Sequence, residues 1–398
     1  MGWSDLRVMV VEDHGFQRRI ALRLLDELGV AQVLECADGL HALDQLRRLP
    51  TPPDVVLVDL DMPGMDGIEC IGHIAQERLA RAVVVVSALD PALLNTVQTM
   101  ARAYGLRVLG SVEKPLTRDK LEGVLGRFDD HVGEEADDAE ADVDLDELAA
   151  ALRNGEIVAW FQPQAEFGNG KVVGVEALAR WERGDGSVVR PHLFVPLLER
   201  EGLANALTDR MLDDACAWKQ RWDRAGQRLR LSVNVSTHAL TDAAAADRYQ
   251  SIVTGYGIAP EDVVLEITES SVMTDAARGL GVLARLRLKG FGLSIDDFGT
   301  GYSSLAQLSQ IPFTELKIDR DFVTGAHAQP RKRAVVEASM DLARKLGLTT
   351  VAEGVETLED WQMLAELGCD VAQGWLVSRP VPGSEVQAAI ARWRRPAH

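Results

Sequence analysis

The sequence predicts an α/β protein in two parts, an open, doubly wound parallel sheet followed by a (β/α)₈ barrel of the TIM type. Three observations support this prediction. Short apolar runs alternate with helical patterns along most of the 398 residues. An acidic segment interrupts the alternation after roughly one third of the chain. Polar residues recur where the strand candidates of the second part end.

The first part has the pattern of a parallel sheet covered on both faces. Val8–Val11, Val55–Val58 and Val83–Val86 are continuously apolar, as strands buried on both faces are. The helix-like stretches Gln17–Leu28 and Ala42–Leu49 lie between them. We therefore expect a doubly wound domain over residues 1–128.

An acidic run marks the boundary between the two parts. Asp129 to Glu147 contains eleven carboxylates and no Lys or Arg. Because like charges repel and stay hydrated, such a run is typical of a solvated linker. We expect a linker at residues 129–145 and a second domain at residues 146–398.

The second part contains eight strand candidates separated mainly by helical stretches. They are Val158–Gln162, Val172–Leu178, Leu229–Val235, Val263–Thr268, Leu293–Asp296, Glu315–Asp319, Thr350–Glu353 and Ala372–Leu376. The segment has roughly the 250 residues usual for a (β/α)₈ barrel.

Seven polar residues fall at or near the C-terminal ends of these candidates. They are Glu176, Asn234, Glu266, Asp296, Lys317, Glu353 and Gln373. Barrel enzymes place their chemistry at that rim, on several different strands. The alternative is a set of edge residues satisfied by ordinary hydrogen bonds, but seven such positions at corresponding strand ends favour a shared site.

The donor types at this rim favour a hard divalent cation. Converging carboxylates repel one another, and a ligand set of oxygens without His or Cys indicates Mg²⁺ or Mn²⁺ rather than zinc. Adjacent Asp296 and Asp297 can serve two ions. Glu353 suits a metal ligand, a general base or both, and Lys317 can stabilise an anionic transition state or orient the attacking water.

The first part has its own candidate site, because strand ends meet at one edge of a parallel sheet. Glu12, Asp13 and Asp59 suit one Mg²⁺, and Asp59 can accept a phosphoryl group. Ser87 and Lys114 can bind the acyl phosphate. As an unrelated set, the five would be ordinary strand-end residues.

Residues 146–398 resemble EAL-domain phosphodiesterases. The matching segments, in order, are Glu176-Ala177-Leu178, Val233-Asn234-Val235, Glu266-Ile267-Thr268-Glu269, Asp296 to Ser304 (DDFGTGYSS), Lys317-Ile318-Asp319, Glu353-Gly354-Val355-Glu356 and Gln373-Gly374. The resemblance implies a modified barrel that opens cyclic di-GMP to linear pGpG. One departure is Trp375, where the family usually has Tyr or Phe.

The resemblance also implies roles for individual residues. Glu176, Asn234, Glu266, Asp296 and Asp297 would bind the metals, Glu353 would be the general base and Lys317 a partner of the water or metal site. Gln162 and Arg180 would lie near the substrate, Asp319 and Gln373 would support the site, and Glu269 would anchor the loop from Asp297 to Ser304.

Residues 5–127 resemble the receiver domains of two-component response regulators. The match lies in Asp59-Leu60-Asp61-Met62-Pro63, Asp66-Gly67 and Lys114-Pro115. It implies phosphorylation by a sensor histidine kinase and regulation of the second domain. Receivers commonly carry a switch aromatic three residues before the Lys, where this chain has Ser111.

Composition and layout exclude several other classes. The net charge of −19 argues against nucleic-acid binding, and no basic recognition helix follows the receiver-like part. No apolar run approaches the roughly 20 residues of a membrane helix, so we expect a cytoplasmic protein without membrane insertion. The family resemblance suggests a homodimer or homotetramer. The alternative to an enzyme is a cyclic di-GMP receptor or docking protein without turnover, against which Glu353 and Lys317 argue.

Overall fold

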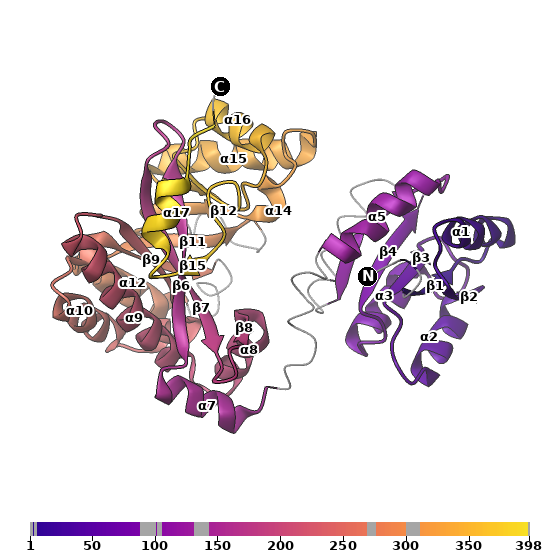
Figure 1. Cartoon of the computed structure of the whole chain (residues 1–398), viewed down its shortest axis with the longest axis horizontal. Coiled ribbons are helices and arrows are strands. Elements are labelled where there is room, and N and C mark those ends of the chain that lie inside the picture. The colour runs from indigo at the N-terminus through magenta and orange to yellow at the C-terminus, as the bar shows by residue number, and fades with distance from the viewer. Residues whose placement is uncertain are drawn as a thin grey trace. The chain divides into compact units, whose positions relative to one another are not determined.

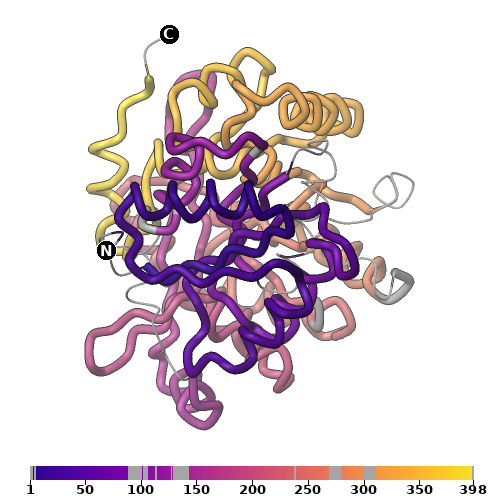
Figure 2. The backbone as a smooth tube through the Cα atoms, turned by 90° about the vertical axis from the view of Figure 1, so that its right-hand side faces the viewer, coloured from indigo at the N-terminus to yellow at the C-terminus, as the bar shows by residue number. Residues whose placement is uncertain are grey.

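The computed structural model describes residues 3, 6–87, 101, 106–130, 143–268, 276–299 and 311–396. The chain divides into two compact units, Met1–Ala139 and Glu140–His398, each with its own sheet (Figure 1). The first unit has two apolar cores and the second has one. Figure 2 traces the backbone, which is indigo to violet in the first unit and magenta to yellow in the second. The predicted α/β class is confirmed for both units.

The first unit is a parallel sheet in the order β2-β1-β3-β4-β5 with helices on both faces (Figure 1). Its elements are β1 (Arg7–Val11), α1 (Gly15–Glu27), β2 (Gln32–Cys36), α2 (Gly39–Arg48), β3 (Val55–Asp59), α3 (Gly67–Gln76), β4 (Ala82–Ser87), β5 (Arg107–Glu113) and α5 (Arg118–Asp130). One core lies between the sheet and α1 and α5, and a second lies between the sheet and α2 and α3. This is the doubly wound arrangement that the sequence predicts.

The second unit is a barrel of eight strands. Its strands are β6 (Ile157–Glu166), β7 (Val172–Glu182), β9 (Arg230–Asn234), β10 (Val263–Thr268), β11 (Gly292–Phe298), β12 (Glu315–Ile318), β13 (Thr349–Ala352) and β14 (Val371–Gln373), with β8 (Val188–Val189) and β15 (Val381–Pro382) as short additions. All eight predicted strands are present. β7 and the strands from β9 to β14 run parallel to one another.

The barrel departs from a regular (β/α)₈ pattern at its first strand. β6 pairs antiparallel with β7 on one side and with β14 on the other, which closes the sheet. A hairpin therefore replaces the usual strand-helix-strand unit, because the five residues between β6 and β7 are too few for a crossover helix. The modified barrel is the form that the sequence resemblance implies.

Helices cover the outside of this barrel. They are α7 (Leu145–Asn154), α8 (Pro191–Arg200), α9 (Ala204–Arg224), α10 (Ala245–Gly255), α12 (Ala276–Leu288), α14 (Arg320–Val323), α15 (Pro330–Leu346), α16 (Leu358–Leu367) and α17 (Val386–Arg392), with 3₁₀ turns η2 (Thr237–Thr241) and η3 (Pro260–Asp262). α9 packs on β6 and β9, and α15 packs on β12 and β13. Within the described residues, no helix is both long and apolar enough to cross a bilayer.

The acidic run between the units contributes to the helices that flank it. α5 extends to Asp130, and α7 begins at Leu145. The Asp144 carboxylate caps α7 by accepting hydrogen bonds from the backbone amides of Asp146 and Glu147, at 2.8 and 3.0 Å. Carboxylates at a helix N-terminus accept hydrogen bonds from the free amides and interact favourably with the helix dipole. Part of the acidic run therefore specifies where α7 starts.

Candidate functional site

Lys317 is the centre of a buried cluster of carboxylates in the barrel. Its ammonium Nζ lies 2.7 Å from Glu353, 2.8 Å from Glu266, 3.1 Å from Asp296 and 3.5 Å from Glu176. These residues come from β12, β10, β11, β7 and the end of β13. The structure therefore brings together five of the residues that the sequence singles out.

Glu176 is held by amide side chains. Asn234 Nδ2 donates to Glu176 Oε1 at 2.8 Å, and Gln373 Nε2 donates to Glu176 Oε2. Gln373 also donates to Gln162 Oε1 at 3.2 Å. Gln164, which the sequence motifs do not indicate, donates to Gln373 Oε1 at 2.8 Å. The two-residue spacing from Gln162 was the available signal, since alternate residues of a strand share a face.

The predicted position of Glu176 near a strand end is wrong. β7 continues to Glu182, so Glu176 lies in the middle of the strand. The reason is that β7 leaves the barrel after Ala177, where its pairing with β9 ends, and goes on pairing with β6 and β8. Glu176 is therefore close to the rim of the barrel although it is far from the end of its strand.

Asp296 and Asp297 reach the same site although they are adjacent on β11. Successive side chains of a strand normally point to opposite faces. Here the register with β12 shifts between Ile295 and Phe298, and Asp297 has a φ of 56°. Such a bulge re-aims a side chain, and Asp tolerates this backbone region better than most residues. One carboxylate oxygen from each of Asp296, Asp297 and Glu353 then lies within 4.8 Å of the others.

The electrostatics of the cluster favour a cation. Burial raises the pKa of Glu353 to about 8 against the opposing effect of Lys317. Burial, together with the Asp296 and Asp319 carboxylates, raises the pKa of Asp297 to about 7. For Lys317, burial acts to lower the pKa, but the surrounding carboxylates raise it well above its ordinary value. The cluster therefore keeps its lysine charged and holds more carboxylates than one lysine can neutralise.

The donor set also fits divalent ions. Glu266 Oε1 is buried and has no hydrogen-bond partner in the described part of the chain, and the same is true of Asp296 Oδ1 apart from its ion pair with Lys317. Every charged side chain of the cluster that could bind a metal is a carboxylate, the ligand that Mg²⁺ and Mn²⁺ prefer. The residues at this end of the barrel thus suit the metals that the sequence predicts.

Other predicted residues lie around this cluster or outside the described residues. Asp319 caps α14 by accepting a hydrogen bond from the Asp321 amide at 2.7 Å, and it lies beside Asp297. Arg180 lies four residues after Glu176 on β7. Its guanidinium carbon Cζ is 5.8 Å from the centroid of the Trp160 ring. The predicted anchor Glu269 and the loop residues from Thr300 to Ser304 lie outside the described residues.

The first unit brings its predicted site residues together at the carboxyl ends of β1, β3, β4 and β5. Lys114 Nζ lies 2.8 Å from Asp59 Oδ2 and 2.9 Å from Glu12 Oε2. Carboxylate oxygens of Glu12, Asp13 and Asp59 lie within 4.8 Å of one another, which suits one divalent cation. Ser87 ends β4 and is buried, and its backbone carbonyl accepts a hydrogen bond from the Lys114 amide at 3.1 Å.

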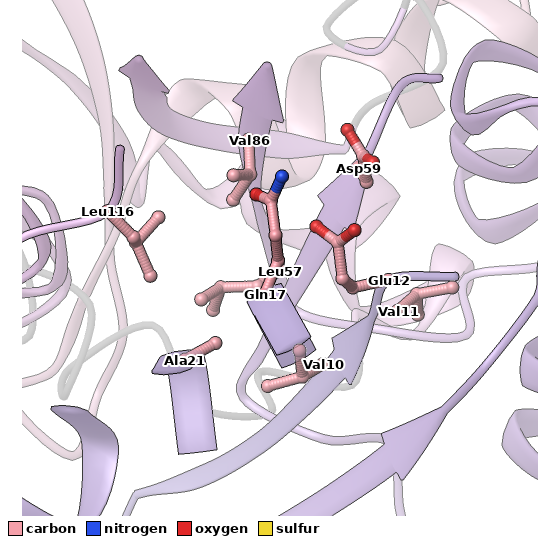
Figure 3. A pocket seen from close by; sticks show the side chains of 9 residues that line it. All are labelled: Val10, Val11, Glu12, Gln17, Ala21, Leu57, Asp59, Val86 and Leu116. Carbon is pink, nitrogen blue, oxygen red and sulfur yellow. The ribbon is translucent and has the colours of Figure 1, made fainter. Parts of the chain in front are cut away.

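A pocket lies beside these acids (Figure 3). Glu12 and Asp59 form its polar side, and the Gln17 side chain extends into it from α1. Burial raises the pKa of Glu12, and Asp59 adds to this effect against Lys114. Ser111, where receivers commonly have a switch aromatic, is half-buried in β5 opposite Val85.

Family models match both units. The EAL domain model matches residues 145–380, and the response regulator receiver domain model matches residues 8–125. The chain belongs to the EAL domain family. Its first unit is a receiver domain, so the chain combines the receiver of a response regulator with an EAL domain.

Known relatives are similar to the whole chain or to its EAL domain. The cyclic di-GMP phosphodiesterase RocR of Pseudomonas aeruginosa is 34% identical, with 95% of this chain and 97% of RocR covered. The solved PaMucR phosphodiesterase, in complex with c-di-GMP, is 39% identical with a TM-score of 0.58, over 61% of this chain and 98% of that chain. The EAL domain of Mycobacterium smegmatis DcpA is 35% identical with a TM-score of 0.52, over 61% of this chain and 99% of that chain.

Proposed function

We propose that this protein is a response regulator whose EAL domain hydrolyses cyclic di-GMP to linear pGpG with Mg²⁺ or Mn²⁺. The observation that carries the proposal is the cluster of four carboxylates around Lys317 at one end of the barrel. The similarity to RocR along nearly the whole chain supports the same substrate.

Each member of the cluster has a proposed role in this reaction. Glu176, Asn234, Glu266, Asp296 and Asp297 would hold two metal ions, which would neutralise the charge of the phosphodiester and polarise its phosphorus–oxygen bonds. Glu353 accepts a proton from the attacking water as the water oxygen bonds to phosphorus and the phosphorus–O3′ bond breaks. O3′ takes a proton from solvent and leaves as a hydroxyl, and Lys317 stabilises the developing charge. Gln162 and Arg180 contact the substrate, while Gln373 and Asp319 hold the ligands in place.

The receiver domain supplies the proposed regulation. Asp59 accepts a phosphoryl group from the phosphohistidine of a sensor kinase, and Glu12, Asp13 and Asp59 would hold one Mg²⁺. Lys114 lies against Asp59 and is placed to bind a phosphoryl oxygen there. The modified side chain would gain charge at the strand ends and thereby bias the output domain.

The deciding experiment is incubation of the purified full chain with cyclic di-GMP and one metal at a time, followed by chromatography of the products. We expect pGpG with Mg²⁺ or Mn²⁺ and no product after chelation. Ca²⁺ should inhibit, because its longer bonds and looser coordination misplace the attacking water. Absence of pGpG with both Mg²⁺ and Mn²⁺ would contradict the enzyme proposal and favour a non-catalytic receptor or docking protein. Light scattering on the same sample tests the expected homodimer or homotetramer.

A second test concerns Glu269, which is proposed to anchor the loop that follows Asp297. Glu269→Ala should raise the Mg²⁺ concentration needed for half-maximal activity and lower turnover by about 10–100-fold, as loss of a supporting residue typically does. A Mg²⁺ titration of activity, with circular dichroism to verify folding, measures both effects. Unchanged turnover with unchanged Mg²⁺ dependence would remove Glu269 from the site.

A further inference from the structure

A second layer of buried polar side chains lies two residues nearer the amino ends of the strands than the carboxylate cluster. Ser232, Ser294 and Glu315 are 1%, 0% and 2% exposed. They precede Asn234, Asp296 and Lys317 by two residues on β9, β11 and β12. Because alternate residues of a strand share a face, they point into the same barrel interior, about 6.6 Å nearer its other end.

Each of these side chains has an oxygen without a partner. Ser232 Oγ, Ser294 Oγ and Glu315 Oε1 are buried and make no hydrogen bond within the described residues, and neither does Glu266 Oε1 in the layer above. An unsatisfied buried polar atom costs about 1–3 kcal/mol, and native proteins contain few of them. Such atoms concentrated in one barrel interior indicate a bound group that satisfies them.

The charge of Glu315 is already balanced by an arginine nearer the amino ends of the strands. Arg230 Nη2 donates to Glu315 Oε2 at 2.6 Å. This bond crosses the barrel interior, because β9 and β12 are separated in the sheet by β10 and β11. Arg230 also lines a cleft at the amino ends of the strands, with Thr349 and Asp370. A neutral group therefore suits the remaining oxygen of Glu315 better than a second cation does.

Ser294 lies between Glu266 and Glu315, each of which has an oxygen that makes no hydrogen bond within the described residues. Its Cα is in register with Glu266 on β10 and with Glu315 on β12. Neighbouring strands are about 4.8 Å apart, and each carboxylate is one strand away from Ser294, a backbone spacing that one bridging water suits. One serine hydroxyl can donate only once, whereas a water can donate to two acceptors and accept from the serine. A buried water with three partners is the usual arrangement in proteins.

We propose that the barrel binds ordered water between Glu266, Ser294 and Glu315, next to Ser232. Through this water, Ser294 and Glu315 act as positioning residues for Glu266. The chain of contacts runs from Arg230 through Glu315 and the water to Glu266, which Lys317 holds from above. The water site stands on the buried atoms alone, whereas the positioning role rests on the proposed function of Glu266 as a metal ligand.

A high-resolution crystal structure of the full chain, with a parallel Rb⁺ soak, tests the water site. We expect a density peak within hydrogen-bond distance of Ser294 Oγ and Glu315 Oε1, without anomalous signal from Rb⁺. Direct hydrogen bonds from the serines to the carboxylates, with no peak between them, would overturn the proposal. A Rb⁺ signal would also overturn it by showing a monovalent cation site.

Mn²⁺ affinity, measured on the protein by electron paramagnetic resonance without substrate, tests the positioning role. Ser294→Ala should weaken Mn²⁺ binding by about 10-fold or more, in the range for lost outer contacts of metal ligands. Glu315→Gln keeps two polar atoms that can bind the water. It should therefore weaken Mn²⁺ binding less than Glu315→Leu does. Ser251→Ala, on the exposed face of α10, is the matched control and should bind Mn²⁺ like the wild type. Unchanged affinity in Ser294→Ala overturns the positioning role, and this result does not depend on whether the wild type turns over cyclic di-GMP.

Discussion

Glu353→Gln is expected to lower turnover of cyclic di-GMP by about 10²–10⁴-fold, the effect of removing a general base. The carboxylate follows β13 directly, its backbone amide donates to the Ile318 carbonyl at 3.0 Å, and its side chain lies 2.7 Å from Lys317. Glutamine has nearly the same shape, so packing should survive while the proton acceptor is lost. Steady-state measurement of pGpG formation at saturating Mg²⁺ gives the effect.

Binding and a control variant separate the chemical step from the other roles of Glu353. Cyclic di-GMP affinity should largely persist, because the substrate contacts are assigned to Gln162 and Arg180. Glu359→Gln, exposed in the first turn of α16, makes the same chemical change outside the cluster and should leave turnover unchanged. If Glu353→Gln retains near wild-type turnover, another residue is the base. If it loses Mn²⁺ affinity to the same extent as turnover, Glu353 acts mainly as a metal ligand.

The barrel could be predicted from sequence because its strands are locally encoded. Val263–Thr268 and Thr349–Ala352 are short runs rich in β-branched residues, and each ends at or just before a polar residue. The same logic brings Glu266, Asp296, Lys317 and Glu353 together, since parallel strands align their carboxyl ends. Hydrophobic pattern and strand direction alone therefore account for most of the cluster.

Features that depend on pairing between strands could not be predicted in this way. The antiparallel direction of β6 follows from its short hairpin to β7 and from its pairing with β14, which no local pattern reveals. The bulge that aims Asp297 into the site appears only as a register shift against β12. Glu315 stands in a strand candidate as one more charged residue, and its contact with Arg230 spans 85 positions of sequence.

The receiver domain shows the same limit. Its central strands β3 and β4 are buried throughout and were predicted from their apolar runs. β2 is an edge strand with exposed and half-buried residues, and β5 contains Arg107, Gly110 and Ser111, so neither has a continuous apolar run. Both are held by their pairing with β1 and β4.

Asp59→Asn is expected to abolish phosphorylation of the receiver domain. Asp59 is the last residue of β3, and its Oδ2 accepts a hydrogen bond from Lys114 Nζ at 2.8 Å. Phosphorylation requires a carboxylate oxygen to attack the phosphorus of a donor such as acetyl phosphate while the bond to acetate breaks. The amide of asparagine is not a nucleophile of this kind, but it preserves the size of the side chain. Mass spectrometry of the intact protein after incubation with acetyl phosphate and Mg²⁺ should show one added phosphoryl group only in the wild type.

The same variant links the receiver to the output domain. Acetyl phosphate should change the phosphodiesterase rate of the wild type and have no effect on Asp59→Asn. Asp44→Asn, on the exposed face of α2, is the matched control and should keep both the label and the response. A label that persists in Asp59→Asn would place the phosphoacceptor elsewhere. A rate that responds to the donor without any label would show that acetyl phosphate acts on the output domain itself, because the charge added at Asp59 is the only change through which the receiver is proposed to signal.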